Sequence, residues 1–220
     1  MGASGLSFRR VAPREGAKTL YLTFDDGPDP VGTPRVLALL AEFGAHATFF
    51  LIGSRARENP ELVREIVSRG HAIGNHSPDH RYVNYFFGRE RLKNWIHAGE
   101  SAISEISGAP TIGFRPPAGV RTPELLRATR EIGTPLILWQ TRFYDSVFAP
   151  TPESLTRSLR TARPGDLILL HDSQRPRNLE LFLVALRAYL KAAHVQFFDF
   201  RALERIHFDV EPERRWVDPS

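Results

Sequence analysis

One stretch near the N-terminus organises the chain, and it reads Leu20-Tyr21-Leu22-Thr23-Phe24-Asp25-Asp26-Gly27-Pro28. Its apolar start has the character of a buried strand, and Gly27-Pro28 forces a turn directly after it. Asp25 and Asp26 therefore lie at the C-terminal end of a strand, where α/β folds place their reactive groups. Adjacent carboxylates repel each other, so a positive group is needed nearby, and a metal ion is the simplest candidate. A plain strand-to-turn junction is the alternative, since Asp-Gly-Pro also suits an ordinary turn.

On either side of this stretch, apolar runs alternate with helical patterns over almost the whole length. Besides the first strand, strands are predicted at about 47–52, 71–74, 111–114, 135–139, 167–170 and 195–198. Helices are predicted at about 33–43, 60–69, 89–107, 123–132, 152–162 and 178–193, and residues 1–18 are predicted to be irregular. This alternation predicts a parallel sheet with helices outside it, as either a barrel or an open doubly wound sheet.

The totals describe a soluble globular protein of 220 residues with 42% hydrophobic and 25% charged side chains. We predict a single domain over residues 19–208, an N-terminal extension over 1–18 and a polar C-terminal tail over 209–220. The net charge of +4 favours an anionic surface such as a cell wall or lipid head groups. There is no basic tract dense enough to indicate nucleic-acid binding, and the absence of cysteine excludes disulfides and thiolate metal ligands.

Membrane and export signals are absent from the printed sequence. No apolar run reaches the roughly 18–20 residues that a membrane helix needs. Residues 1–6 lack the apolar core of a signal peptide, so export would require that a leader had been removed. The residues themselves leave the compartment and the oligomeric state open.

Polar side chains suited to chemistry follow one predicted strand after another. They are Asp25 and Asp26, His76 and His80, Arg115, Asp145, and His171 with Asp172. In a parallel barrel, the ends of all these strands share one rim. One such junction carries little information, but five that converge on the same rim predict an active site.

His76 and His80 are four residues apart, and the intervening Pro78 predicts a tight irregular turn rather than a helix. Together with a carboxylate from the Asp25-Asp26 pair, they would make a His-His-Asp set that leaves positions open for water and substrate on a divalent ion. Two surface histidines near a turn are the alternative.

His171 and Arg115 also have two interpretations each. His171 ends an apolar run, so it is either a general acid tuned by a carboxylate or a satisfied core histidine. Arg115 precedes two prolines, so it either holds an aspartate ionised and oriented or lies on the surface.

Five motifs appear in an order that is typical of one protein family. They are Thr23-Phe24-Asp25-Asp26-Gly27-Pro28, His76-Ser77-Pro78-Asp79-His80, Arg115-Pro116-Pro117-Ala118-Gly119, Trp139 through Asp145, and Leu169-Leu170-His171-Asp172. From about residue 19 to residue 200, the chain resembles the polysaccharide deacetylases of carbohydrate esterase family 4, which carry the NodB-homology domain. The resemblance implies an α/β fold, a distorted (β/α) barrel with about seven parallel strands.

The resemblance also implies a role for each matching residue. Asp26, His76 and His80 would bind a divalent metal, zinc first and cobalt or nickel as alternatives. Asp25 would be the base that takes a proton from water, and His171 the acid that protonates the departing amine. Arg115 would hold Asp25, and Asp145, which is assigned by counting from Trp139, would tune His171.

Two motifs depart from the family pattern. Ala118 stands where the family usually has tyrosine, which removes part of a groove wall. The family's Asp-x-x-Asp-Trp is replaced by Arg142-Phe143-Tyr144-Asp145-Ser146, so the first aspartate and the tryptophan that lines the acetyl pocket are missing. These changes affect the expected substrate more than the expected reaction.

The resemblance therefore implies a metal-dependent hydrolase of carbon–nitrogen bonds other than peptide bonds. It would remove N-acetyl groups from a glycan such as peptidoglycan, chitin-like oligomers or poly-N-acetylglucosamine, in the cell envelope or outside the cell, with a cytoplasmic location left open. An O-acetyl esterase, a deformylase acting on a lipid-linked amino sugar and a carbohydrate-binding barrel without turnover are the alternatives. The aromatic segment 82–87 offers either sugar-stacking faces or packing for the next helix.

Overall fold

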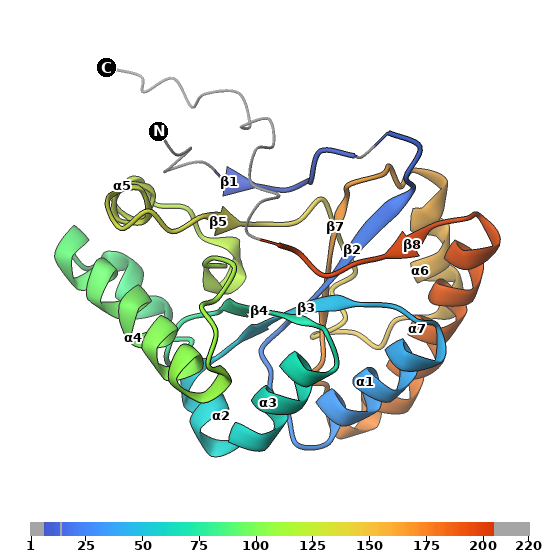
Figure 1. Ribbon diagram of the computed structural model, residues 1–220, viewed down its shortest axis with the longest axis horizontal. Coiled ribbons are helices and arrows are strands. Elements are labelled where there is room, and N and C mark those ends of the chain that lie inside the picture. Colours follow the sequence, from blue (N-terminus) through green and yellow to red (C-terminus); the bar gives the residue numbers. More distant parts are fainter. Residues whose placement is uncertain (1–6, 14, 205–220) are drawn as a thin grey trace.

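The computed structural model describes residues 7–13 and 15–204, in which helices surround a set of parallel strands (Figure 1). The strands are β1 (Ser7–Phe8), β2 (Thr19–Asp25), β3 (Ala47–Leu51), β4 (Ala72–Asn75), β5 (Leu136–Ile137), β6 (Thr141–Arg142), β7 (Leu167–His171) and β8 (Asp199–Phe200). The α-helices are α1 (Gly32–Glu42), α2 (Gly53–Glu58), α3 (Pro60–Ser68), α4 (Arg89–Ser107), α5 (Pro123–Glu131), α6 (Pro152–Arg157) and α7 (Pro176–Val195). The predicted tail 209–220 lies outside the described residues, and the division into extension, domain and tail stays a prediction.

Strand β2 is the centre of the sheet. It pairs in parallel with β3 on one side and β7 on the other, which gives the order β4-β3-β2-β7-β6, and β8 pairs with the beginning of β2. Beyond β4, Phe114 forms bridges to Asn75 and to Leu136, and these bridges connect β5 and its partner β1 to the other strands. The Gln140 amide donates to the Leu167 carbonyl at 2.8 Å, which connects the segment after β5 to β7. This arrangement confirms the predicted α/β fold with a distorted barrel.

Alternation along β2 separates the core from the site. All seven residues of β2 are buried. Leu20, Leu22 and Phe24 belong to the large apolar cluster that includes residues of α1, α3 and α7. Tyr21 belongs instead to a smaller cluster with Phe50 and Ile137, and it points to the opposite face of the strand. Asp25 has the parity of Tyr21, so its carboxylate is directed to the inner side of the barrel.

Several element predictions differ from the structure, and α2 and β6 have no predicted counterpart. The strand predicted at 111–114 is reduced to isolated bridges at Phe114, although the Ile112 amide still donates to the Ile73 carbonyl at 2.9 Å. At its start, the Thr111 amide donates to the Glu100 side chain at 2.9 Å and not to a strand. The position predicted for the last strand, 195–198, is wrong, because α7 continues to Val195 and the strand, β8, follows at Asp199–Phe200. Residues 7–8 form β1, although 1–18 were expected to be irregular.

Helix α1 starts one residue before the predicted start at residue 33. The helix begins at Gly32, and Asp29 Oδ1 accepts hydrogen bonds from the Val31 and Gly32 amides. The Thr33 hydroxyl accepts from the Asp29 amide and donates to the Asp172 carboxyl. Thr33 therefore connects the turn after β2 to the end of β7. None of the helices in the described ranges has the length and apolarity needed to cross a bilayer.

Replacing Phe49 tests how far the core supports β2. Phe49 is fully buried and its ring stacks on Phe24 at a centroid distance of 5.1 Å. Phe49→Ala should lower the free energy of unfolding by about 3–5 kcal/mol, because a cavity replaces a buried ring. Urea unfolding measures the loss, with Phe86→Ala as the control, since Phe86 is 87% exposed and should change stability by about 0.5 kcal/mol or less. Equal losses in the two variants would contradict this account of the core.

Candidate active site

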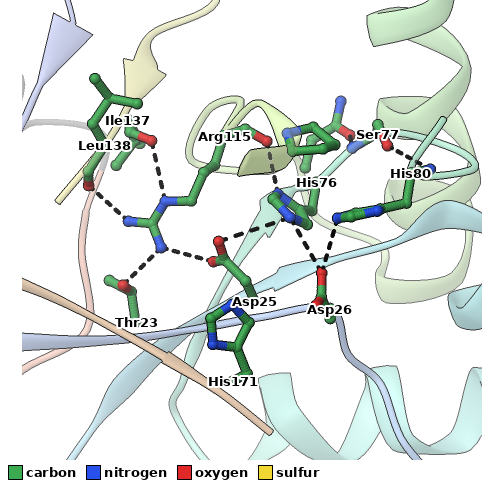
Figure 2. Close-up of polar contacts among 12 residues, drawn as sticks. Thr23, Asp25, Asp26, His76, Ser77, His80, Arg115, Ile137, Leu138 and His171 are labelled. Carbon is green, nitrogen blue, oxygen red and sulfur yellow. Dashed lines mark hydrogen bonds and ion pairs between the residues drawn. The ribbon is translucent and has the colours of Figure 1, made fainter. Parts of the chain in front are cut away.

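Arg115 is the most deeply buried large side chain of the site, with no exposed surface. Its Nε donates to the Ile137 carbonyl at 3.1 Å and Nη2 to the Leu138 carbonyl at 2.8 Å. Nη1 donates to both Thr23 Oγ1 and Asp25 Oδ1 at 2.7 Å (Figure 2). The guanidinium also lies 3.9 Å from the centre of the Phe50 ring. The structure thus places Arg115 in the interior, where it holds Asp25, and not on the surface.

Asp25 has one carboxylate oxygen committed and one directed into the site. Oδ1 accepts from Arg115, whereas Oδ2 lies 3.8 Å from His76 Nε2. In the strand register, Asp25 is the direct neighbour of His171 on β7, and Figure 2 shows the two side chains close together. Because an ion pair with Arg115 orients the carboxylate, Oδ2 remains available as a proton acceptor.

Asp26, His76 and His80 come together at the rim, as the sequence predicted. Asp26 Oδ1 lies 3.4 Å from His76 Nε2 and 3.2 Å from His80 Nε2, and one ligand atom of each residue lies within 4.8 Å of the others. Burial by itself would raise the pKa of Asp26, but the two imidazoles outweigh burial and hold that pKa well below its usual value. Asp26 therefore stays ionised.

The loop after β4 orients the two imidazoles. His76 Nδ1 contacts the Arg115 carbonyl at 2.8 Å, so Nδ1 carries the proton and the Nε2 lone pair is free to face Asp26. The turn is irregular, with φ of 77° at Ser77 and 56° at His80, and the His80 amide donates to Ser77 Oγ at 2.9 Å. This tight turn confirms the geometry expected from Pro78.

These three residues fit a divalent metal ion. Asp26 Oδ1 is a buried oxygen that makes no aligned hydrogen bond, although two imidazole nitrogens lie beside it. A tetrahedral ion with bonds of about 2.0–2.1 Å holds its ligand atoms roughly 3.3 Å apart, close to the two nitrogen–oxygen separations observed here. The bond from His76 Nδ1 to a carbonyl is the outer contact that metal-binding histidines ordinarily make.

His171 and Asp145 form the second half of the site. His171 Nδ1 lies 3.0 Å from Asp145 Oδ1, and the His171 amide donates to Asp145 Oδ2 at 2.7 Å. Asp145 is fully buried. Burial alone would lower the pKa of His171, but the hydrogen bond and charge of Asp145, with Asp25 and Asp26, raise it to about 9. The structure thus places Asp145, which was assigned by counting from Trp139, beside His171.

Three side chains that the sequence analysis did not select complete the arrangement. Thr23 accepts from Arg115 beside Asp25. Gln174 Nε2 donates to Asp145 Oδ2 at 3.0 Å and to the His171 carbonyl at 2.7 Å. Arg55 Nη1 donates to the Asp26 carbonyl at 2.6 Å. Thr23 lies two residues before Asp25 on the same face of the strand, which is a usable signal, whereas Gln174 and Arg55 have no recognisable sequence pattern.

The departures from the family motifs lie on the exposed side of the site. Ala118 is exposed, with φ of 55°. Arg142, which stands in place of the first aspartate, is also exposed, and its guanidinium lies 3.9 Å from the centre of the Tyr144 ring, whereas Ser146, which stands in place of the tryptophan, is half-buried. In the segment 82–87, Tyr85 is buried against Trp95 as packing requires, but Tyr82 is 52% exposed and its ring lies 5.3 Å from that of His80. The segment therefore serves packing in part and leaves one ring at the rim.

Comparison with known proteins gives consistent matches. Residues 12–137 match the polysaccharide deacetylase family. The chain is 38% identical over 163 residues to a peptidoglycan-N-acetylglucosamine deacetylase of Bacillus cereus, which covers 73% of this chain and 76% of that protein. It is 32% identical over 212 residues to a chitooligosaccharide deacetylase of Sinorhizobium fredii, over 92% and 99% of the two chains.

A solved structure of a deacetylase is also similar to this chain. A peptidoglycan N-acetylglucosamine deacetylase in complex with 4-naphthalen-1-yl-N-oxidanyl-benzamide superimposes with a TM-score of 0.82 at 27% identity, over 96% of both chains. The likeness therefore spans nearly all of both chains.

Asp172 provides a test of the electrostatics next to the site. It is fully buried, and burial raises its pKa from an ordinary 3.8 to about 7. Ionisation of Asp172 therefore destabilises the fold increasingly from about pH 4 to about pH 7, and the cost is constant above that. The free energy of unfolding of the wild type relative to the neutral variant Asp172→Asn should fall over this range. Urea unfolding of the metal-free proteins between pH 4 and 8 measures the difference, and a difference independent of pH would contradict the expectation.

Proposed function

The chain belongs to the polysaccharide deacetylase family, and from this premise we propose that it is a metal-dependent hydrolase that removes N-acetyl groups from a glycan containing N-acetylglucosamine. The observation that carries the proposal is the Asp26–His76–His80 set, which lies beside Asp25 on the same rim. The names of two relatives, a peptidoglycan-N-acetylglucosamine deacetylase and a chitooligosaccharide deacetylase, support the substrate class. They also support action in the cell envelope or outside the cell.

Asp26, His76 and His80 would hold the metal. A bound divalent ion, zinc first and cobalt or nickel as alternatives, would lower the pKa of water and polarise the acetamide carbonyl. The protein contributes the orientation, because donation from His76 Nδ1 to the Arg115 carbonyl fixes the ring and directs Nε2 towards Asp26.

Asp25 takes the proton from the attacking water. Arg115 occupies Oδ1, so Oδ2 accepts the proton on the side that faces His76. The buried guanidinium pairs with Asp25 and prevents rotation of the carboxylate. A proton acceptor held at a fixed position accelerates a hydrolysis by about 10²–10⁴-fold.

His171 supplies the proton for the leaving group. Its Nδ1–H is held by Asp145, so the charged imidazole presents Nε2–H to the amide nitrogen. The water oxygen bonds to the carbonyl carbon, the carbon–nitrogen bond breaks, and the proton from Nε2 goes to the departing nitrogen. The products are acetate and the amine in its protonated form, and transfer of the proton held by Asp25 back to His171 restores both groups, which balances the hydrolysis of one acetamide by one water.

Acetate release tests this function. Metal-stripped protein, with and without added zinc or cobalt, should release acetate from N-acetylglucosamine oligomers or peptidoglycan only when metal is present. Asp25→Asn should lower the rate by about 10²-fold or more because it removes the proton acceptor, whereas the exposed surface variant Glu61→Gln should keep it. Acetylated xylan and formylated amino sugars in the same panel distinguish an O-acetyl esterase and a deformylase. Metal binding without turnover of any of these substrates would favour a carbohydrate-binding barrel.

The pH profile tests the role of His171. An acid with a pKa of about 9 is protonated at neutral pH, so activity should persist up to about pH 9 and decline above it. Asp145→Asn removes the negative partner and should move this alkaline limb to lower pH as well as lower the rate. The measurement is kcat/KM between pH 6 and 10.5 at saturating metal. An alkaline limb that stays in place in Asp145→Asn would contradict the assignment of the acid to His171.

A further inference from the structure

Arg55 links the two halves of the site, although it belongs to none of the five motifs. It lies in α2, and its side chain is partly buried. Nη1 donates to the Asp26 carbonyl at 2.6 Å and to Ser173 Oγ at 2.5 Å. Asp26 is one of the proposed metal ligands, and Ser173 lies two residues after His171. One guanidinium nitrogen therefore contacts both the turn after β2 and the loop after β7.

The Asp26 backbone has a conformation that needs external support. Its φ of 72° lies in the left-handed region, which residues with a Cβ atom rarely adopt and which persists only when the surroundings enforce it. The following residue is confined as well, since a Cβ atom at Gly27 would lie 2.5 Å from Asp172 Oδ2. The Asp26 carboxylate can occupy its place beside His76 and His80 only while this turn keeps its shape.

The loop after β7 contacts the site through three consecutive residues. Asp172 accepts from Thr33 at the start of α1, and Ser173 accepts from Arg55. Gln174 donates to Asp145, the partner of His171. Arg55 is the member of this arrangement that reaches Asp26 itself, so it is placed to fix the distance between the metal side and the acid side.

We propose that Arg55 is a positioning residue that holds the Asp26 backbone in its left-handed conformation and ties it to the loop carrying His171. The inference rests on the proposed function in that it takes Asp26 as a metal ligand. It adds a residue outside the ligand set that affects metal affinity, and it assigns a positioning role to the hydrogen bond with Ser173. An arginine exposed on the surface would have no effect on metal affinity or on the position of this loop.

The experiment compares Arg55→Met, which keeps the aliphatic stem but removes the donors, with Arg57→Met, a matched control on the exposed side of the same helix. Zinc and cobalt affinities are measured by titration of metal-stripped protein, together with kcat and KM for acetate release. Hydrogen exchange of the segment 23–30 is measured in the metal-free proteins. We expect Arg55→Met to bind metal about tenfold more weakly, with faster exchange in this segment and a lower kcat at unchanged KM, and Arg57→Met to match the wild type.

A double-mutant cycle with Ser173→Ala isolates the contact. If the bridge to Ser173 matters, the double variant should bind metal as tightly as Arg55→Met alone, within about twofold. Independent effects that multiply, or an Arg55→Met protein that equals Arg57→Met in metal affinity and exchange, would overturn the proposal. The exchange measurement requires neither metal nor substrate, so a failure of the proposed function, seen as metal-bound wild type that releases no acetate, is distinguishable from a failure of this inference.

Discussion

The ion pair between Arg115 and Asp25 is the interaction on which the rest of the site depends. The guanidinium has no exposed surface, and removing a charge from water is costly unless partners replace the water. Here every partner belongs to the barrel: Asp25 and Thr23 on β2, and the carbonyls of Ile137 and Leu138. Burial lowers the pKa of Arg115, and the charge of Asp25 opposes this. The Arg115 carbonyl in turn orients His76, so one residue fixes both the proposed base and one proposed metal ligand.

Four carboxyl groups lie close together at this rim, and each is accommodated in a different way. Asp25 is paired with a buried guanidinium, and Asp26 lies between two imidazoles. Asp145 is fully buried and accepts hydrogen bonds from His171 and Gln174. Within residues 7–13 and 15–204, the Asp172 carboxyl accepts a side-chain hydrogen bond from the Thr33 hydroxyl alone, and burial raises its pKa to about 7. Like charges repel at short range, so neighbouring carboxylates need different partners. Because each group has its own surroundings, the protonation states and the roles of the four groups can differ.

The sequence predicted the parts of the structure that have local signals. The alternation of apolar runs predicted the barrel, and polar residues at strand ends predicted Asp25, His76, His80 and His171, because parallel strands bring their ends to one rim. The false strand at 195–198 arose because a short apolar run fits either a strand or the end of a helix; in the structure Phe197 is 83% exposed. Arg55 was missed because Ser173 lies 118 positions away in sequence, and Gln174 because its Asp145 partner lies 29 positions away.

The buried and exposed sides of the site are constrained differently, and this bears on specificity. The proposed base and the Asp145 partner of the acid are buried, and each is paired with a charged or titratable side chain, so a substitution there leaves that side chain buried without its partner. Ala118 and Arg142 are exposed and Ser146 is half-buried, so the chain can change these residues at little cost in stability. The departures from the family pattern lie on this exposed side. Under the proposed function, a relative's reaction is therefore a better guide to this protein than a relative's choice of glycan, since the proposed base and the partner of the proposed acid are buried and the departures from the family pattern are not.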